Sequence, residues 1–260
     1  MQRKRTSIAR SSTLVLRVSV LAFALAFVAV PRTSAAKAPV AADAESPTPL
    51  LGRLAHHAAQ FEEMKRRGSF TLRGYVEELD GDGHVDGTKE MVVRVTATPS
   101  ERLTEVVKYL EDGADKTAEA RKRAEKRRGE RRRGKGDKAR DLRLPFLASE
   151  QARYVFRLVE RDIGNPSHVR VAFSPRVPAE DAVKGSAWVD EAAGEILTMG
   201  FSLSKNPTFI EHVDVTMRFD LATPLGRAPS SVTFAARGGF LFLRKHYRGT
   251  ASITDAHLGF

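Results

Sequence analysis

Alternation of apolar and polar residues is clearest between Phe209 and Leu221. The apolar residues recur at every second position on one face: Phe209, Val213, Val215, Met217, Phe219 and Leu221. The other face is polar: His212, Asp214, Thr216, Arg218 and Asp220. Only Ile210 and Glu211 break the pattern. A period of two predicts a β-strand with one buried face and one face in water.

Similar alternation recurs on both sides of residues 115–143 and predicts about ten antiparallel strands. We expect three of them before this segment and seven after it. The sheet is predicted to resume at Leu144–Leu147, and no helix is expected beyond residue 143.

A helical pattern precedes the first strand. Between Leu50 and Arg67, apolar residues recur at spacings of three and four: Leu50, Leu54, Ala58, Phe61 and Met64. This spacing predicts an amphipathic helix of about five turns that ends at Gly68.

One helix about 10 Å wide cannot cover a broad sheet whose strands lie about 4.8 Å apart. The sequence therefore predicts a mainly β (α+β) protein, a strongly curved antiparallel sheet or open half-barrel. Two interpretations of its apolar faces stay open: a fully packed core, or a cavity for an acyl chain or similar ligand. The residues expected to line such a cavity are Leu197, Met199, Phe201, Val213, Val215, Met217, Phe219, Phe234 and Phe242.

The first 36 residues are typical of a secretory signal peptide. A basic start precedes an apolar run of 13 residues, Val18–Val30, which is shorter than the roughly 20 residues of a membrane span. We expect cleavage after Ala36 and a periplasmic or secreted protein. Residues 37–49 are predicted to be a flexible N-terminus, and residues 50–260 a single domain with a basic insert at 115–143.

The net charge of +11 is unevenly distributed. Residues 1–36 contribute +6 and residues 116–143 contribute +9, so the remainder of the chain carries −4. This distribution argues against nucleic-acid binding by the body of the protein. The basic residues expected to meet an anionic partner are Arg121, Lys122, Arg127, Arg128, Arg131, Arg132 and Arg133. Because the insert lacks aromatic residues that stack on bases, an anionic lipid or envelope polymer suits it better than nucleic acid. The leading interpretation of the insert is nevertheless a solvated helical or disordered loop without a partner.

No motif predicts an enzyme. The chain has no cysteine, which excludes thiol catalysis and disulfides, and it has no G-x-S-x-G, H-E-x-x-H or phosphate-loop pattern. We expect no cofactor. His212 and Asp214 are interpreted as part of a solvated polar face.

The acidic segment Asp80–Asp86 contains residue types found in calcium-binding loops. Counted from Asp82, the twelfth position of an EF-hand loop is Val93, where a bidentate Glu is needed. An acidic hairpin turn is the better interpretation, so no metal site is predicted.

Three segments resemble exported bacterial proteins grouped with the periplasmic carriers of outer-membrane lipoproteins, the Lol-type superfamily. They are WVDEAAGEIL at Trp188–Leu197, FSLSKNP at Phe201–Pro207 and GGFLFLRK at Gly238–Lys245. The resemblance covers about residues 50–256 and implies an open curved sheet whose concave apolar face receives lipid acyl chains. It also implies a strand arginine that holds a lid closed; Arg73 and Arg94 lie on early strands, and no motif identifies either as that residue.

These observations favour an exported, non-enzymatic carrier of a lipid or lipid-modified ligand. The alternative is a packed β scaffold whose basic insert tethers it to anionic envelope components.

Overall fold

The computed structural model describes residues 48–98, 102–132, 143–240 and 243–258. The predicted signal peptide, most of the N-terminal segment, and the candidate residues Arg133 and Phe242 lie outside these ranges.

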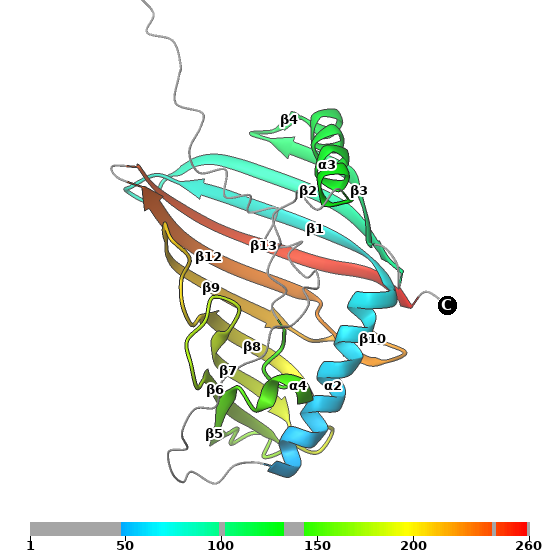
Figure 1. The fold of residues 1–260 in the computed structure, drawn as a ribbon, viewed down its shortest axis with the longest axis vertical. Coiled ribbons are helices and arrows are strands. Elements are labelled where there is room, and N and C mark those ends of the chain that lie inside the picture. The colour runs from blue at the N-terminus through cyan, green and yellow to red at the C-terminus, as the bar shows by residue number, and fades with distance from the viewer. Residues whose placement is uncertain (1–47, 99–101, 133–142, 241–242, 259–260) are drawn as a thin grey trace, which may run out of the picture.

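Strands make up most of the described chain. Their bounds are β1 (Gly68–Leu79), β2 (Val85–Ala97), β3 (Arg102–Glu111), β4 (Ala114–Asp115), β5 (Tyr154–Arg161), β6 (His168–Pro175), β7 (Val183–Asp190), β8 (Glu195–Leu203), β9 (Ile210–Arg218), β10 (Leu221–Thr223), β11 (Gly226–Ala228), β12 (Ser231–Phe240) and β13 (Leu243–Leu258). Eleven of them form one sheet in the order β4-β3-β2-β1-β13-β12-β9-β8-β7-β6-β5, and β10 pairs with β11 separately. Figure 1 shows how β13, from the end of the chain, lies between β1 and β12.

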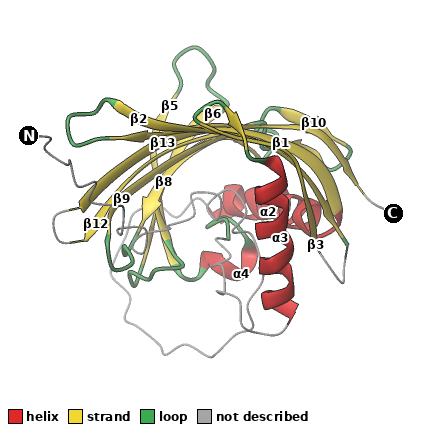
Figure 2. Cartoon of the chain, turned by 90° about the horizontal axis from the view of Figure 1, so that it is seen from above, coloured by secondary structure: helices red, strands yellow, loops and turns green. Residues whose placement is uncertain are grey.

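The large sheet is antiparallel throughout and is not closed, because its edge strands β4 and β5 do not pair with each other. Figure 2 shows it as an arch with all three described helices on the concave side. The predicted fold class, an open curved antiparallel sheet, is confirmed. The three strands expected before the insert and the seven after it are all present, and the short β4 adds an edge.

Three local predictions are wrong. Leu144–Leu147 forms a turn, not a strand, and the short helix α4 (Ala148–Gln151) follows it where no helix was expected. Phe209 precedes β9 in a left-handed conformation with φ of 73° and is 46% exposed, so the alternating face begins after it. The apolar run Leu144–Leu147 is still buried for the most part, because Phe146 packs on the rings of Phe156 and Phe173.

The predicted N-terminal helix is α2 (Thr48–Arg67). Its apolar stripe is buried throughout: Leu50, Leu54, Ala58, Phe61 and Met64. Lys65, Arg66 and Arg67 occupy the last turn, where the helix dipole favours cations.

Two separate clusters of buried side chains form the core. The larger lies between α2 and strands β5 to β9. The smaller lies between β1, β2, β3 and the helix α3 (Thr117–Arg132), which forms most of the described part of the insert. Ala120 of α3 is only 7% exposed in this second cluster. The insert is therefore partly integrated into the fold and is not simply a solvated loop.

Candidate functional site

The centre of the concave face is an apolar surface built by strand register. One row of cross-strand neighbours runs from β8 to β1: Phe201, Val215, Phe234, Gly249 and Val76. The next row is Met199, Met217, Val232, Ala251 and Gly74. Because every second residue faces the same side, both rows point toward the side of the helices.

Small residues make this surface fit closely. A Cβ atom added to Gly249 would lie 2.7 Å from the ring of Phe234, so the absence of a side chain lets that ring lie against β13. A Cβ atom added to Gly74 would likewise lie 3.1 Å from the side chain of Met91. Glycine on these central strands thus allows large apolar side chains of neighbouring strands to lie flat on the sheet.

The helices flank the centre of this face. Among the described elements, α2 packs mainly on β8, β11, α4 and parts of β1 and β2, and α3 packs on β3. Between them, four half-buried apolar side chains pack against the larger core cluster on β8 and β12: Phe201, Val232, Phe234 and Ala236. We call these four residues the central strip.

Most predicted cavity-lining residues face the concave side. Five are buried in the larger core cluster: Met199, Val213, Val215, Met217 and Phe219. Phe219 lies beneath α2, with its ring 6.0 Å from that of Phe61 and 5.9 Å from that of His57. Phe201 and Phe234 belong to the central strip, and Phe242 lies outside the described residues.

Leu197 does not share a face with Met199, contrary to the alternation in the sequence. A register shift makes Trp188 pair with Thr198 and Val189 with Ile196, leaving Leu197 as the extra residue of a bulge. Ile196, fully buried, takes the core position, and Leu197 is half-buried and outside the core cluster.

His57 joins α2 to the sheet, and the sequence pattern did not single it out. The backbone N–H of Ile196 donates to His57 Nδ1 at 2.9 Å, so Nδ1 is an acceptor and Nε2 carries the proton. Nε2 then donates to the carbonyl of Arg227 at 2.7 Å. His57 is 2% exposed, and this burial lowers its pKa below the ordinary value.

A polar cluster closes one end of the concave face. Lys245 of β13 is paired with Glu78 of β1 and lies 3.8 Å from Asp86. The hydrogen bond with Glu78 raises the pKa of Lys245, and burial, then the nearby Glu78 carboxylate, raise the pKa of Tyr247. Lys245, Glu78 and Tyr247 are half-buried, whereas Asp86 is exposed. The apolar surface therefore ends at the paired charges of Lys245 and Glu78.

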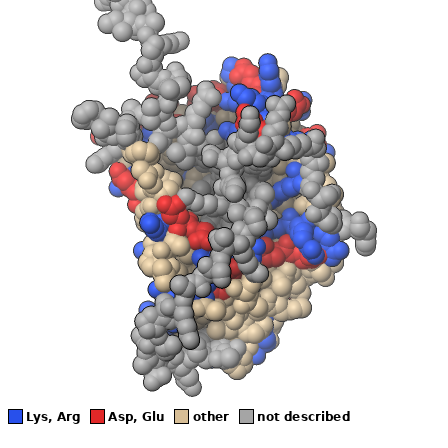
Figure 3. Space-filling view, in the orientation of Figure 1, with Lys and Arg blue, Asp and Glu red and all other residues tan. Residues whose placement is uncertain are grey.

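The basic helix α3 divides into a docked side and an exposed side. Arg121, predicted to meet an anionic partner, donates from Nε to the carbonyl of Val106 at 2.8 Å and so fastens α3 to β3. Lys122, Arg127 and Arg128 are exposed. Arg131 and Arg132 occupy the last turn of α3. Figure 3 shows basic and acidic side chains together on this helix.

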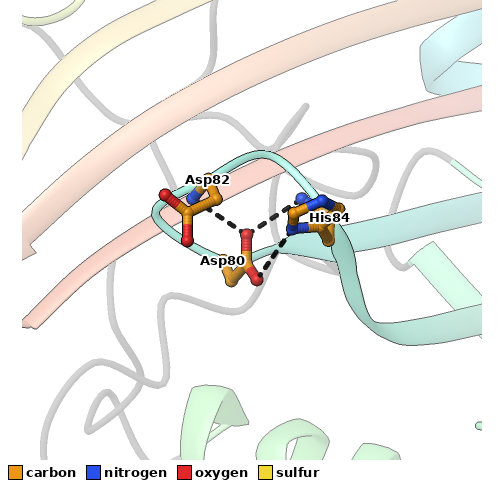
Figure 4. A group of neighbouring side chains, drawn as sticks. All are labelled: Asp80, Asp82 and His84. Carbon is orange, nitrogen blue, oxygen red and sulfur yellow. Dashed lines mark hydrogen bonds and ion pairs between the residues drawn. The ribbon is translucent and has the colours of Figure 1, made fainter.

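Asp80, Asp82 and His84 lie together at the β1–β2 hairpin (Figure 4). Their possible metal-ligand atoms are all within 4.8 Å of one another. Asp80 Oδ1 accepts the backbone N–H groups of Asp82 and His84, each at 2.9 Å. The hydrogen bond from the His84 backbone is the main reason that the pKa of Asp80 is lowered. This arrangement is that of a hairpin turn held by an aspartate side chain.

The remaining candidate side chains lie on the opposite, outer face. His212 and Asp214 are exposed there and contact each other at 2.5 Å. Arg73 and Arg94 also point outward, and Arg94 is 3.4 Å from Glu105. No helix in the described ranges has the length and apolar composition needed to cross a membrane.

No protein-family model matches the chain, and no curated protein matches it. Solved structures similar to it include proteins of the superfamily that the sequence resembles. One is a LolA superfamily protein from Nitrosomonas europaea, at 10% identity and a TM-score of 0.37, covering 84% of this chain and 95% of that one. Another is a putative outer membrane lipoprotein-sorting protein domain from Vibrio parahaemolyticus, at 12% identity and a TM-score of 0.39, covering 80% and 91%.

The MucA/MucB complex of Pseudomonas aeruginosa is also similar, at 13% identity and a TM-score of 0.22, covering 82% of this chain and 99% of that one. Similarity at this level adds no residue or ligand, so the function is inferred from the geometry of this chain.

Proposed function

We propose that this chain is an exported, non-enzymatic binding protein that holds a lipid acyl chain or a lipid-modified ligand against its concave face. The observation that carries the proposal is the central strip, whose apolar side chains are half-buried between the parts of the sheet that α2 and α3 cover. Apolar side chains gain free energy when they leave water, and an acyl chain laid along the strip would complete their burial.

The register defines the direction of the ligand. Phe201 and Phe234 lie in one cross-strand row through Val215, so an extended chain along this row crosses β8, β9 and β12. The polar cluster around Lys245 and Glu78 ends the apolar surface toward the β12–β13 hairpin, and it suits the polar end of such a ligand.

Displacement of a fluorescent fatty acid from the full chain, purified from an exporting host, tests the proposal. Phe234→Glu places a carboxylate in the strip, and since burial of a Phe side chain is worth roughly 1.5–3 kcal/mol, affinity should fall about tenfold or more. Val159→Glu is the matched control, because Val159 is 49% exposed on the edge strand β5.

Native mass spectrometry of the protein from its own envelope is the second measurement. A bound mass that organic extraction removes supports the proposal. A ligand-free mass together with unchanged fatty-acid affinity in Phe234→Glu would show that the strip is ordinary core.

A second function has support from α3. Its exposed Lys122, Arg127 and Arg128 are carried on a helix that Arg121 fastens to the sheet, so the charges are presented from a fixed position. We infer that this side of α3 attaches the protein to anionic envelope lipid, at about 1 kcal/mol per basic residue near the surface.

Substitution of these three residues by Gln tests the attachment better than deletion of the insert, because Ala120 and Arg121 belong to the fold. The triple variant should sediment less than the unchanged chain with vesicles that contain anionic lipid. Added salt should reduce the sedimentation of the unchanged chain. If sedimentation is equal for the variant and the unchanged chain, α3 is not the attachment surface.

A further inference from the structure

The outer face of the sheet, turned away from the helices in Figure 2, carries a hollow that the lipid-binding proposal does not use. Its volume is about 510 Å³, within the range of about 300–1,000 Å³ that ligand pockets occupy. It spans β3, β2, β1, β13 and β12.

Two adjacent rows of outward side chains form its lining. One row is Ser231, Ser252, Arg73, Val92 and Lys108. The other row is Thr233, Thr250, Tyr75 and Glu90. Between the rows, the floor is the strand backbone of Gly74 and of Val232, Ala251 and Met91, and the side chains of the last three point to the concave face. We call this lined hollow the outer groove.

The charges of the outer groove differ from those beside it. The neighbouring rows of the same face contain ion pairs, Arg94 with Glu105 on one side and Arg248 with Glu77 on the other. Within the described part of the chain, Arg73 and Lys108 are in no ion pair.

Glu90, on the other row, has no ion pair among the described residues either, and it acts electrostatically on Tyr75. Lys108 acts electrostatically on Asp115 of β4 without a direct contact. The charged groups of Arg73, Lys108 and Glu90 therefore face the groove and are available to hydrogen-bond a ligand.

These groups match one ligand chemistry. Four hydroxyl side chains and the Glu90 carboxylate can exchange hydrogen bonds with a ligand rich in hydroxyl groups. The guanidinium of Arg73 can hold a carboxylate with two parallel hydrogen bonds, and Lys108 adds a second positive charge. The ring of Tyr75, 38% exposed, offers an apolar surface for the C–H face of a sugar.

We propose that the outer groove binds an acidic saccharide, one that carries carboxylate groups and free hydroxyls. Eight of the nine outward side chains of the groove carry a polar or charged group, and an acyl chain would leave these groups without hydrogen-bond partners. Nucleic acid fits poorly as well, since a single aromatic residue provides no stacking platform for successive bases. The saccharide site and the concave face lie on opposite sides of the sheet, so both ligands can be bound at once.

Chemical-shift titration of the ¹⁵N-labelled full chain with trigalacturonic acid tests the proposal, with neutral maltotriose as the comparison. Because the lining is exposed, we expect weak binding, with a Kd on the order of 1 mM at low salt. Shift changes should centre on Thr250 and Ser252 of β13, and maltotriose should bind at least about tenfold more weakly.

Arg73→Gln and Lys108→Gln should each weaken trigalacturonate binding by about tenfold, the effect of one lost charge-assisted contact. Arg94→Gln is the matched control, an outward arginine of the same face that is already paired, and its affinity should stay within about twofold of the unchanged chain. All three positions are exposed, so circular dichroism should show an unchanged fold.

Three results would each overturn the assignment. Maltotriose could bind as tightly as trigalacturonate, or Arg94→Gln could weaken trigalacturonate binding as much as Arg73→Gln and Lys108→Gln do. Inorganic phosphate could also bind with the affinity and the shift changes of trigalacturonate. Saturation with a fatty acid should leave the saccharide titration unchanged. This result separates the outer groove from the proposed lipid function, since either ligand can fail to bind without affecting the other.

Discussion

The strongest prediction concerns His57, the buried side chain that joins α2 to the sheet. Replacement by alanine removes the two hydrogen bonds to Ile196 N and Arg227 O and leaves a buried N–H group without an acceptor. It also empties the space beside the ring of Phe219. Two hydrogen bonds, one orphaned donor and a ring-sized cavity together predict that His57→Ala lowers the free energy of unfolding by about 3–5 kcal/mol.

Urea denaturation followed by the fluorescence of Trp188, the single tryptophan of the chain, measures this loss. His56→Ala is the control, because His56 precedes it on the same helix and is exposed, and its effect should be within about 0.5 kcal/mol. A His57→Ala loss below about 1 kcal/mol, or one equal to that of His56→Ala, would refute the claim that this histidine fastens the helix.

His57 also predicts the direction of a pH effect. Its pKa is lowered in the folded state, so the unfolded chain binds a proton more readily. Stability from the neutral ring is therefore fully present above the ordinary pKa of 6.5 and is lost as the pH falls below it toward the folded-state value. The physical cause is burial, which disfavours the charged ring. A protonated ring also cannot accept the Ile196 N–H.

Urea midpoints of the unchanged chain and of His57→Gln, measured from pH 8 to pH 5, isolate this contribution from that of the other histidines. The difference between the two proteins should shrink as the pH falls. A constant difference over this range would mean that the protonation of His57 is not linked to folding.

Three further substitutions test the packing. Gly249→Ala should destabilise the fold by about 1–3 kcal/mol in urea denaturation, because the new Cβ would lie 2.6 Å from the carbonyl oxygen of Tyr75. Gly52→Ala, in an exposed helix position with no atom within 4 Å of the new Cβ, should instead raise the unfolding free energy by about 1 kcal/mol. Arg121→Ala removes the hydrogen bond to Val106 and should speed hydrogen exchange across α3, whereas unchanged exchange there would show that α3 is held without it.

The sequence alone was sufficient where the determining pattern is local. The stripe of α2 and the alternating face from Val213 to Phe219 are buried as predicted, because the 3.6 and 2.0 residue periods decide which side chains share a face. The apolar faces of the predicted strands, with one predicted helix too narrow to cover them, likewise predicted an open curved sheet.

Only the tertiary structure decided the features that depend on strand register and on pairing between segments distant in the sequence. The bulge that exchanges Leu197 for Ile196 is defined only by pairing with β7. The docking of the insert depends on the Val106 carbonyl of β3, which accepts a hydrogen bond from Arg121. The outer groove requires β1 to pair with β13, from opposite ends of the described chain. Side-chain alternation fixes the face of a residue within its own strand, but its neighbours across the sheet are set by the long-range hydrogen bonds of the folded chain.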